Sequence, residues 1–165
     1  MRRSGAAPIP ALLRSPEPSI RWKTRVQVLG ESSDAKAIRS LREEIRGSPT
    51  VRALLSRHAQ LGRPGTRRQV YYKWQGLHWV LASLADLGYP EGDKTLHPLR
   101  DRVVELWLSP AYFHDFPART EAEAYRGRGV PLMRGRYRRC ASQQGNALYS
   151  LLTLGIADVR AHSLA

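Results

Sequence analysis

Hydrophobic residues recur at steps of three and four over most of this chain, which is the spacing of one face of a helix. Within residues 19–59 the pattern predicts three short helices. Gly30 and Gly47 follow the last apolar positions of the first two helices, where glycine commonly ends a helix. Pro49 stands at the first position of the third helix, where its missing N–H costs no hydrogen bond.

Two further helices differ in how their apolar positions are distributed. Residues 70–88 carry apolar side chains on two sides and end at Gly88, whereas residues 95–109 carry them on one side only. A helix that is apolar on more than one side has neighbours on more than one side. We therefore expect an inner helix at 70–88, followed by an outer helix.

The second half of the chain begins with a weaker pattern. Residues 109–129 show no clear period and are expected to be irregular, and a small β-ribbon near 130–139 is predicted to turn at Arg134-Gly135. Ser142 is the expected N-cap of the helix that follows, which ends at Gly155.

Two of the predicted helices share a sequence frame. LASLADLG at 81–88 and LYSLLTLG at 148–155 both read L-x-S-L-x-x-L-G, with an offset of 67 residues. A recurring inner-helix pattern is the mark of a repeat architecture. We therefore expect residues 70–88 and 142–155 to be neighbouring inner helices.

The segments KWQGLHWVLASLADLGYP and RRCASQQGNALYSLLTLGIAD resemble a group of bacterial proteins built from prenyltransferase and squalene-cyclase-type repeats. The resemblance runs from about Pro18 to the end of the chain. It implies an α/α toroid, in which helical hairpins stack into a double-layered ring. It also implies that Gln144 replaces a glutamate, which removes any acid role for that position.

The resemblance further implies that more hairpins follow the segment matching residues 157–165. We therefore expect an N-terminal fragment of such a toroid, which self-associates through its exposed last hairpin. Residues 1–18 are Pro-rich and basic and are expected to be a disordered arm, and residues 19–165 to be an all-α domain apart from the ribbon.

The composition indicates where in the cell the protein is expected and whether it spans a membrane. A single cysteine excludes an intramolecular disulfide and fits a reducing cytoplasm, which is the expected location. No run of about 18 apolar residues is present, so no membrane span is expected.

The formal net charge of +13 comes almost entirely from arginine. It has two interpretations, a GC-rich coding sequence or a phosphate-binding surface. In the second, the protein is a basic helical nucleic-acid-binding protein. AIRSLREEIRGSPTVRALLSRH resembles a helix-turn-helix in outline, and residues 119–139, with Tyr125 and Tyr137 among the arginines, are the other candidate surface.

The chain lacks the motifs of the enzymes that share the toroid fold, and it also lacks the phosphate-binding loop of P-loop proteins. It has no Asp-x-Asp-Asp acid, no zinc-ligand spacing among one cysteine and five histidines, and no G-x-x-x-x-G-K-[ST] loop. We therefore expect no metal and no cofactor; a non-catalytic role is favoured, and catalysis stays open as the alternative. Cys140 is the weak candidate nucleophile, because the adjacent arginines and helix start favour a thiolate; its alternative is a small packed residue.

The resemblance implies an apolar or isoprenoid-like ligand, and the helix start together with Arg139 favours an anionic head on it. The first inner helix offers side chains for the apolar body, for which ordinary core packing is the alternative, and the second offers polar groups for the head. These candidate ligand-binding residues are Tyr72, His78, Trp79, Arg139, Ser142, Gln143 and Asn146.

Overall fold

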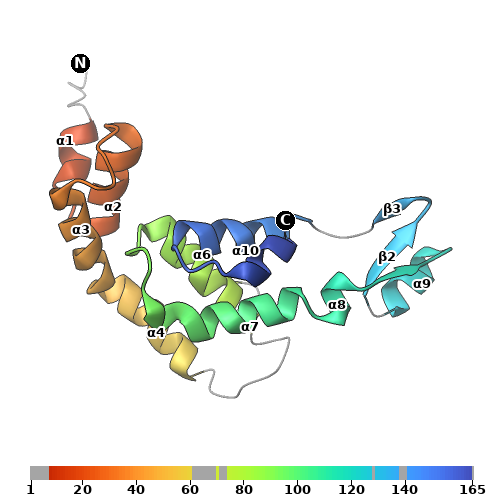
Figure 1. Cartoon of the computed structure of the whole chain (residues 1–165). Coiled ribbons are helices and arrows are strands. Elements are labelled where there is room, and N and C mark those ends of the chain that lie inside the picture. Colours follow the sequence, from red (N-terminus) through yellow and green to blue (C-terminus); the bar gives the residue numbers. More distant parts are fainter. Residues whose placement is uncertain (1–7, 61–69, 71–73, 128, 138–140, 165) are drawn as a thin grey trace, which may run out of the picture.

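The computed structural model describes residues 8–60, 70, 74–127, 129–137 and 141–164 of the chain (Figure 1). The fold is mostly helical, with one small three-stranded sheet. The predicted helical class and the β-ribbon are therefore confirmed. Among the candidate site residues predicted from the sequence, Tyr72, Arg139 and Cys140 lie outside the described residues.

The N-terminal third consists of short helices, as the spacing predicts for residues 19–59. They are α1 (Pro8–Leu13), α2 (Pro18–Lys23), the π-helical turn η1 (Thr24–Val28), α3 (Lys36–Arg46) and α4 (Pro49–Gln60). Helix α1 lies in the segment 1–18, which its Pro-rich composition predicted to be a disordered arm. Pro8 and Pro10 both lie in its first turn, where backbone N–H groups have no partner within the helix.

The centre of the molecule is built from longer helices that pack side by side. They are α6 (Leu77–Leu87), η2 (Lys94–Leu96), α7 (His97–Trp107), α8 (Pro110–Phe113), α10 (Ala141–Thr153) and η3 (Val159–Leu164). Helix α6 lies among α10, α7, α4 and α2 and contacts all four (Figure 1). It buries residues on two sides, whereas α7 buries residues on one side. The prediction that residues 70–88 and 142–155 are neighbours is confirmed, because α6 contacts α10.

Two predictions of helix bounds are wrong. The helix predicted over residues 70–88 is not continuous: Val70 is helical, but Trp74 adopts a left-handed backbone (φ 65°), Gly76 is an extended N-cap, and α6 begins at Leu77. A left-handed residue cannot continue the hydrogen-bond ladder of a right-handed helix. Ser142 is not an N-cap, because α10 already begins at Ala141.

The sheet unit projects from the helices beyond α8 (Figure 1). It contains β1 (Asp115–Pro117), α9 (Glu121–Arg126), β2 (Val130–Met133) and β3 (Arg136–Tyr137), in the sheet order β1-β2-β3. Strands β2 and β3 pair antiparallel across Arg134 and Gly135, which both have positive φ, as a two-residue hairpin turn requires.

The segment 109–129, expected to be irregular, holds α8, β1 and α9. Strand β1 pairs parallel with β2, and α9 forms the crossover between them. A sequence signal for α9 exists in Thr120-Glu121-Ala122-Glu123, since a threonine followed three residues later by glutamate is a capping box. Thr120 accepts a hydrogen bond from the Glu123 N–H, and the Glu123 carboxylate accepts one from the Arg119 N–H at 2.7 Å.

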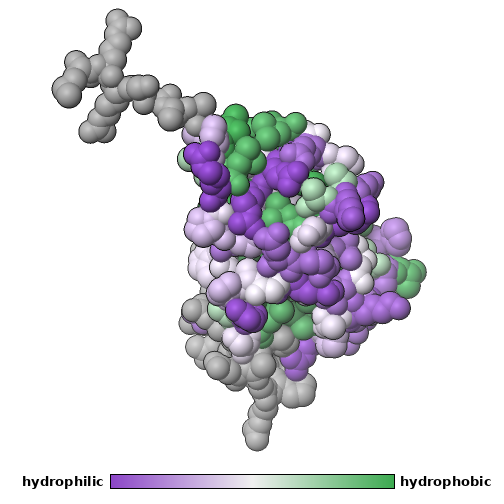
Figure 2. Space-filling model, turned by 90° about the vertical axis from the view of Figure 1, so that its left-hand side faces the viewer, coloured by the Kyte–Doolittle hydropathy of each residue, from purple (hydrophilic) through white to green (hydrophobic). Residues whose placement is uncertain are grey.

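The N-terminal helices are docked on the C-terminal end of α6 through Trp22. Its buried ring lies directly against Gly88, which ends α6 with φ 81°. The guanidinium group of Arg42, on α3, lies over the Trp22 ring, 5.4 Å from its centroid. Arg42 also forms an ion pair with Glu91 at 2.7 Å. The face of the molecule seen in Figure 2 is largely hydrophilic, with smaller hydrophobic patches between the hydrophilic residues.

We predict that Gly88→Ala destabilises the protein by about 2–4 kcal/mol, the sum of a left-handed backbone penalty and overpacking. An added Cβ would lie 2.4 Å from the Trp22 ring. Gly30→Ala is the matched control, because Gly30 also has positive φ but nothing within 4 Å of its Cβ position. Urea unfolding of both variants separates the two costs, and equal losses would contradict a tight contact with Trp22.

Candidate functional site at the junction of three helices

Helices α6 and α10 run parallel, and α7 runs antiparallel to both. At one end, the Gly92 N–H just after α6 donates to the carbonyl of Leu154 just after α10, at 2.8 Å. At the other end, the last residue of α7, Trp107, contacts the first turns of α6 and α10. This second end gathers the described candidate site residues.

Trp107 joins the two parallel helices by hydrogen bonds. Its indole Nε1–H donates to Nδ1 of His78 at 3.3 Å, and its carbonyl accepts from Nε2 of Gln144 at 3.5 Å. The three residues are 1%, 1% and 4% exposed, respectively. A buried polar group without a partner costs free energy, so these bonds hold all three helices in register.

An aromatic cluster surrounds this junction. The His78 ring meets Trp79 edge-on at 5.1 Å and Trp107 at 5.5 Å, and Trp107 meets Tyr112 at 4.8 Å. Trp79 in turn lies 4.5 Å from Trp74, whose side chain is largely exposed. The cluster therefore runs from the core to the surface.

His78 is neutral at physiological pH. Burial lowers its pKa from 6.5 to about 4, because the charged imidazolium loses its hydration there. Since Nδ1 accepts the Trp107 hydrogen bond, the ring hydrogen of the neutral imidazole is on Nε2. The structure thus assigns His78 to the core, which is the packing alternative for this residue.

The candidates on α10 lie in its first two turns. Ser142 is exposed and Gln143 is half-buried in the first turn. Asn146 is half-buried in the second turn, and its Oδ1 is shielded from solvent without a hydrogen-bond partner in the described part of the chain. The structure therefore brings Gln143 and Asn146 onto the helix that neighbours His78 and Trp79.

Sequence reasoning missed Trp107 as a polar residue and Gln144 as its partner. Trp107 fits the apolar face of α7 so well that its N–H gives no separate signal. A chemical signal for this pair was present in the sequence. A buried indole N–H needs an acceptor, and His78, the only residue of α6 that titrates near neutral pH, offers a ring nitrogen that can accept.

The two copies of the repeat frame have the same local structure. Gly88 and Gly155 both have positive φ, 81° and 61°. The Tyr89 N–H donates to the carbonyl of Leu84 at 3.1 Å, and 67 residues later the Ile156 N–H donates to the carbonyl of Leu151 at 3.0 Å. The frame therefore encodes one helix ending, the Schellman motif, in both copies.

Arginines in the helical part are largely engaged by carboxylates. In the segment that resembles a helix-turn-helix, Arg42 pairs with Glu91, and Arg46 pairs with Glu43 and Asp93. The sheet unit differs: its described arginines are exposed, and their guanidinium groups form no ion pair with another described residue. They are Arg119, Arg126, Arg134 and Arg136.

No protein-family model matches the sequence, and neither a curated protein nor a solved structure shows detectable similarity to it. Within the described ranges, no three His, Cys, Asp or Glu side chains lie close enough together to hold a metal ion. None of the described helices has the length and apolar character needed to cross a membrane.

We predict that stability falls by about 2–3 kcal/mol between pH 7.5 and 4.5, because the unfolded chain takes up a proton at His78 that the native state refuses. The loss begins near the unfolded pKa of 6.5 and is complete below about 4. His78→Gln should remove this dependence in urea unfolding. Asp101 and Asp158 act at lower pH, because hydrogen bonds from Arg160 lower their pKa values below 3.8. An unchanged pH dependence in His78→Gln would contradict a buried neutral imidazole.

Proposed function

We propose that this chain is a non-catalytic helical-repeat protein of the prenyltransferase and squalene-cyclase-like toroid type, which binds an apolar or isoprenoid-like ligand with an anionic head. The observation that carries the repeat architecture is the shared helix ending 67 residues apart, at Gly88 and Gly155. The order of parallel, antiparallel and parallel helices in α6, α7 and α10 supports the same arrangement, since stacked hairpins alternate in this way.

The non-catalytic part of the proposal rests on the chemistry of the junction. His78 is neutral, buried and hydrogen-bonded to Trp107, so it holds helices together and has no access to a substrate. Gln144, at the position where the resemblance implies glutamate, donates to the Trp107 carbonyl in the same way. Both side chains are used in packing.

The ligand-binding part rests on Asn146. The Asn146 Oδ1 has no hydrogen-bond partner in the part of the chain that the structure describes, and a shielded oxygen of this kind typically costs about 1–3 kcal/mol. A carboxamide both donates and accepts, so it can anchor the polar end of a ligand whose apolar body lies against aromatic side chains. Trp79, on the neighbouring helix, supplies such a side chain.

The proposal includes self-association through the outer side of α10. Leu152 is 61% exposed, whereas Ala85, the residue at the same place in the first copy of the frame, is 3% exposed. Tyr149 and Val159 are exposed on the same C-terminal part of the chain. An apolar face that is covered in one copy and open in the next is a surface for another helical unit.

The alternative is a nucleic-acid-binding protein. The paired arginines of α3 disfavour the helix-turn-helix version, since Arg42 and Arg46 are already engaged by carboxylates. The exposed arginines of the sheet unit, together with exposed Tyr125 and Tyr137, favour a version in which the ribbon contacts a single strand.

We predict that Asn146→Leu raises the free energy of unfolding by about 1 kcal/mol, because it removes a buried unsatisfied atom, and weakens ligand binding about tenfold. The probe is farnesyl diphosphate, compared with farnesol and inorganic diphosphate by tryptophan fluorescence titration. Thr153→Leu, at the other end of α10, is the control. Equal affinity of the wild type and Asn146→Leu for farnesyl diphosphate would contradict a ligand site at Asn146. Retention on nucleic acid at about 200 mM salt would favour the alternative instead.

We predict that Leu152→Glu lowers self-association, because a buried carboxylate at the contact would lose its hydration. Sedimentation velocity over a concentration series measures the effect. Leu12→Glu is the matched control, since Leu12 is also partly exposed but lies on α1. A wild-type protein that remains monomeric throughout would contradict the proposed contact.

A further inference from the structure

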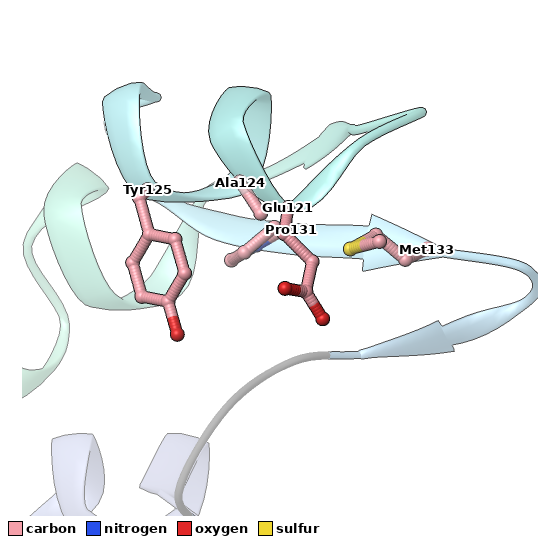
Figure 3. A pocket seen from close by; sticks show the side chains of 5 residues that line it. All are labelled: Glu121, Ala124, Tyr125, Pro131 and Met133. Atoms are coloured by element: carbon pink, nitrogen blue, oxygen red, sulfur yellow. The ribbon is translucent and has the colours of Figure 1, made fainter.

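A cavity of about 260 Å³ lies between α9 and β2, in the sheet unit and apart from the helix junction (Figure 3). Three of its lining residues come from the helix and two from the strand. They are Glu121, Ala124, Tyr125, Pro131 and Met133.

The lining follows from the periods of the two elements. Glu121, Ala124 and Tyr125 are spaced i, i+3 and i+4, so they share one face of α9. Pro131 and Met133 are two residues apart, so they share one face of β2. The cavity is therefore the space between one face of a helix and one face of a strand.

The helix that forms one wall is fixed at both ends. The Thr120 hydroxyl and the Glu123 carboxylate cap its start. At its end, the Phe116 ring of β1 lies so close to Gly127 that an added Cβ there would be 2.1 Å from the ring. The wall is thus held by contacts that do not involve the cavity.

The chemistry of the lining is apolar with one charge. Met133 is buried in the floor, and Ala124 and Pro131 extend the apolar surface. The Tyr125 ring is 89% exposed, and it extends from α9 toward the same side as the Glu121 carboxylate (Figure 3). Glu121 forms no ion pair with any residue that the structure describes, although the chain carries a net charge of +13.

We propose that this cavity binds a small organic monocation, an ammonium group attached to a compact aromatic or aliphatic body. The Glu121 carboxylate pairs with the ammonium group, and the face of the Tyr125 ring attracts the same positive charge. The apolar body lies on Met133, whose thioether packs well against aromatic rings. An anion would meet the carboxylate and is rejected.

Three probes with the same ring test the sign of the charge: benzylammonium, benzyl alcohol and benzoate. Ligand-detected NMR, which registers weak binding, should rank benzylammonium first, benzyl alcohol second and benzoate last. Glu121→Gln should weaken benzylammonium binding about threefold to tenfold and leave benzyl alcohol unchanged. Glu105→Gln, which removes an exposed carboxylate from α7, is the matched control and should change neither.

Tyr125→Leu tests the aromatic wall, because leucine keeps an apolar surface but has no π face. It should reduce the preference for benzylammonium over benzyl alcohol. Benzoate binding as tightly as benzylammonium would overturn the proposal, since the arginines of the sheet unit would then dominate. An unchanged benzylammonium affinity in Glu121→Gln would overturn it as well. Circular dichroism of both variants verifies that the unit stays folded.

Discussion

The indole of Trp107 is the point on which the arrangement of the central helices depends. Trp107 ends α7 and binds the first turns of α6 and α10, the first through its indole N–H and the second through its backbone carbonyl. Because both partners are buried, neither bond can be exchanged for water when the helices shift. This contact holds α6 and α10 in their parallel alignment, and the burial of His78 at the same place keeps its imidazole neutral.

Helix ends could be predicted from the sequence, whereas contacts between distant residues could not. Gly30, Gly88 and Gly155, all with positive φ, and Pro49 mark boundaries because the backbone preference of one residue decides them. The pairing of His78 with Trp107 depends on how whole helices pack, and no local pattern encodes it. The same reason explains why β1 is not predicted, since it pairs with β2 across a crossover helix. In addition, β1 is only three residues long and shows no alternation of apolar and polar residues.

Charge is distributed unevenly over the molecule. In the helical part, carboxylates are matched to arginines between elements, as in the network of Arg100, Asp101, Asp158 and Arg160 that ties α7 to the end of the chain. In the sheet unit, arginines are exposed and the Glu121 carboxylate faces a cavity. Composition alone predicts neither arrangement, because a net charge does not say which side chains meet.

The two Schellman endings also bear on how such a chain can change over time. Since the frames at 81–88 and 148–155 close with the same backbone bonds, a crossover between their glycine codons would preserve the loop geometry on both sides. A duplication or deletion at that point would add or remove one whole unit without leaving a broken helix. The sheet unit lies inside the interval and would travel with it, so helical framework and inserted ribbon would be inherited together.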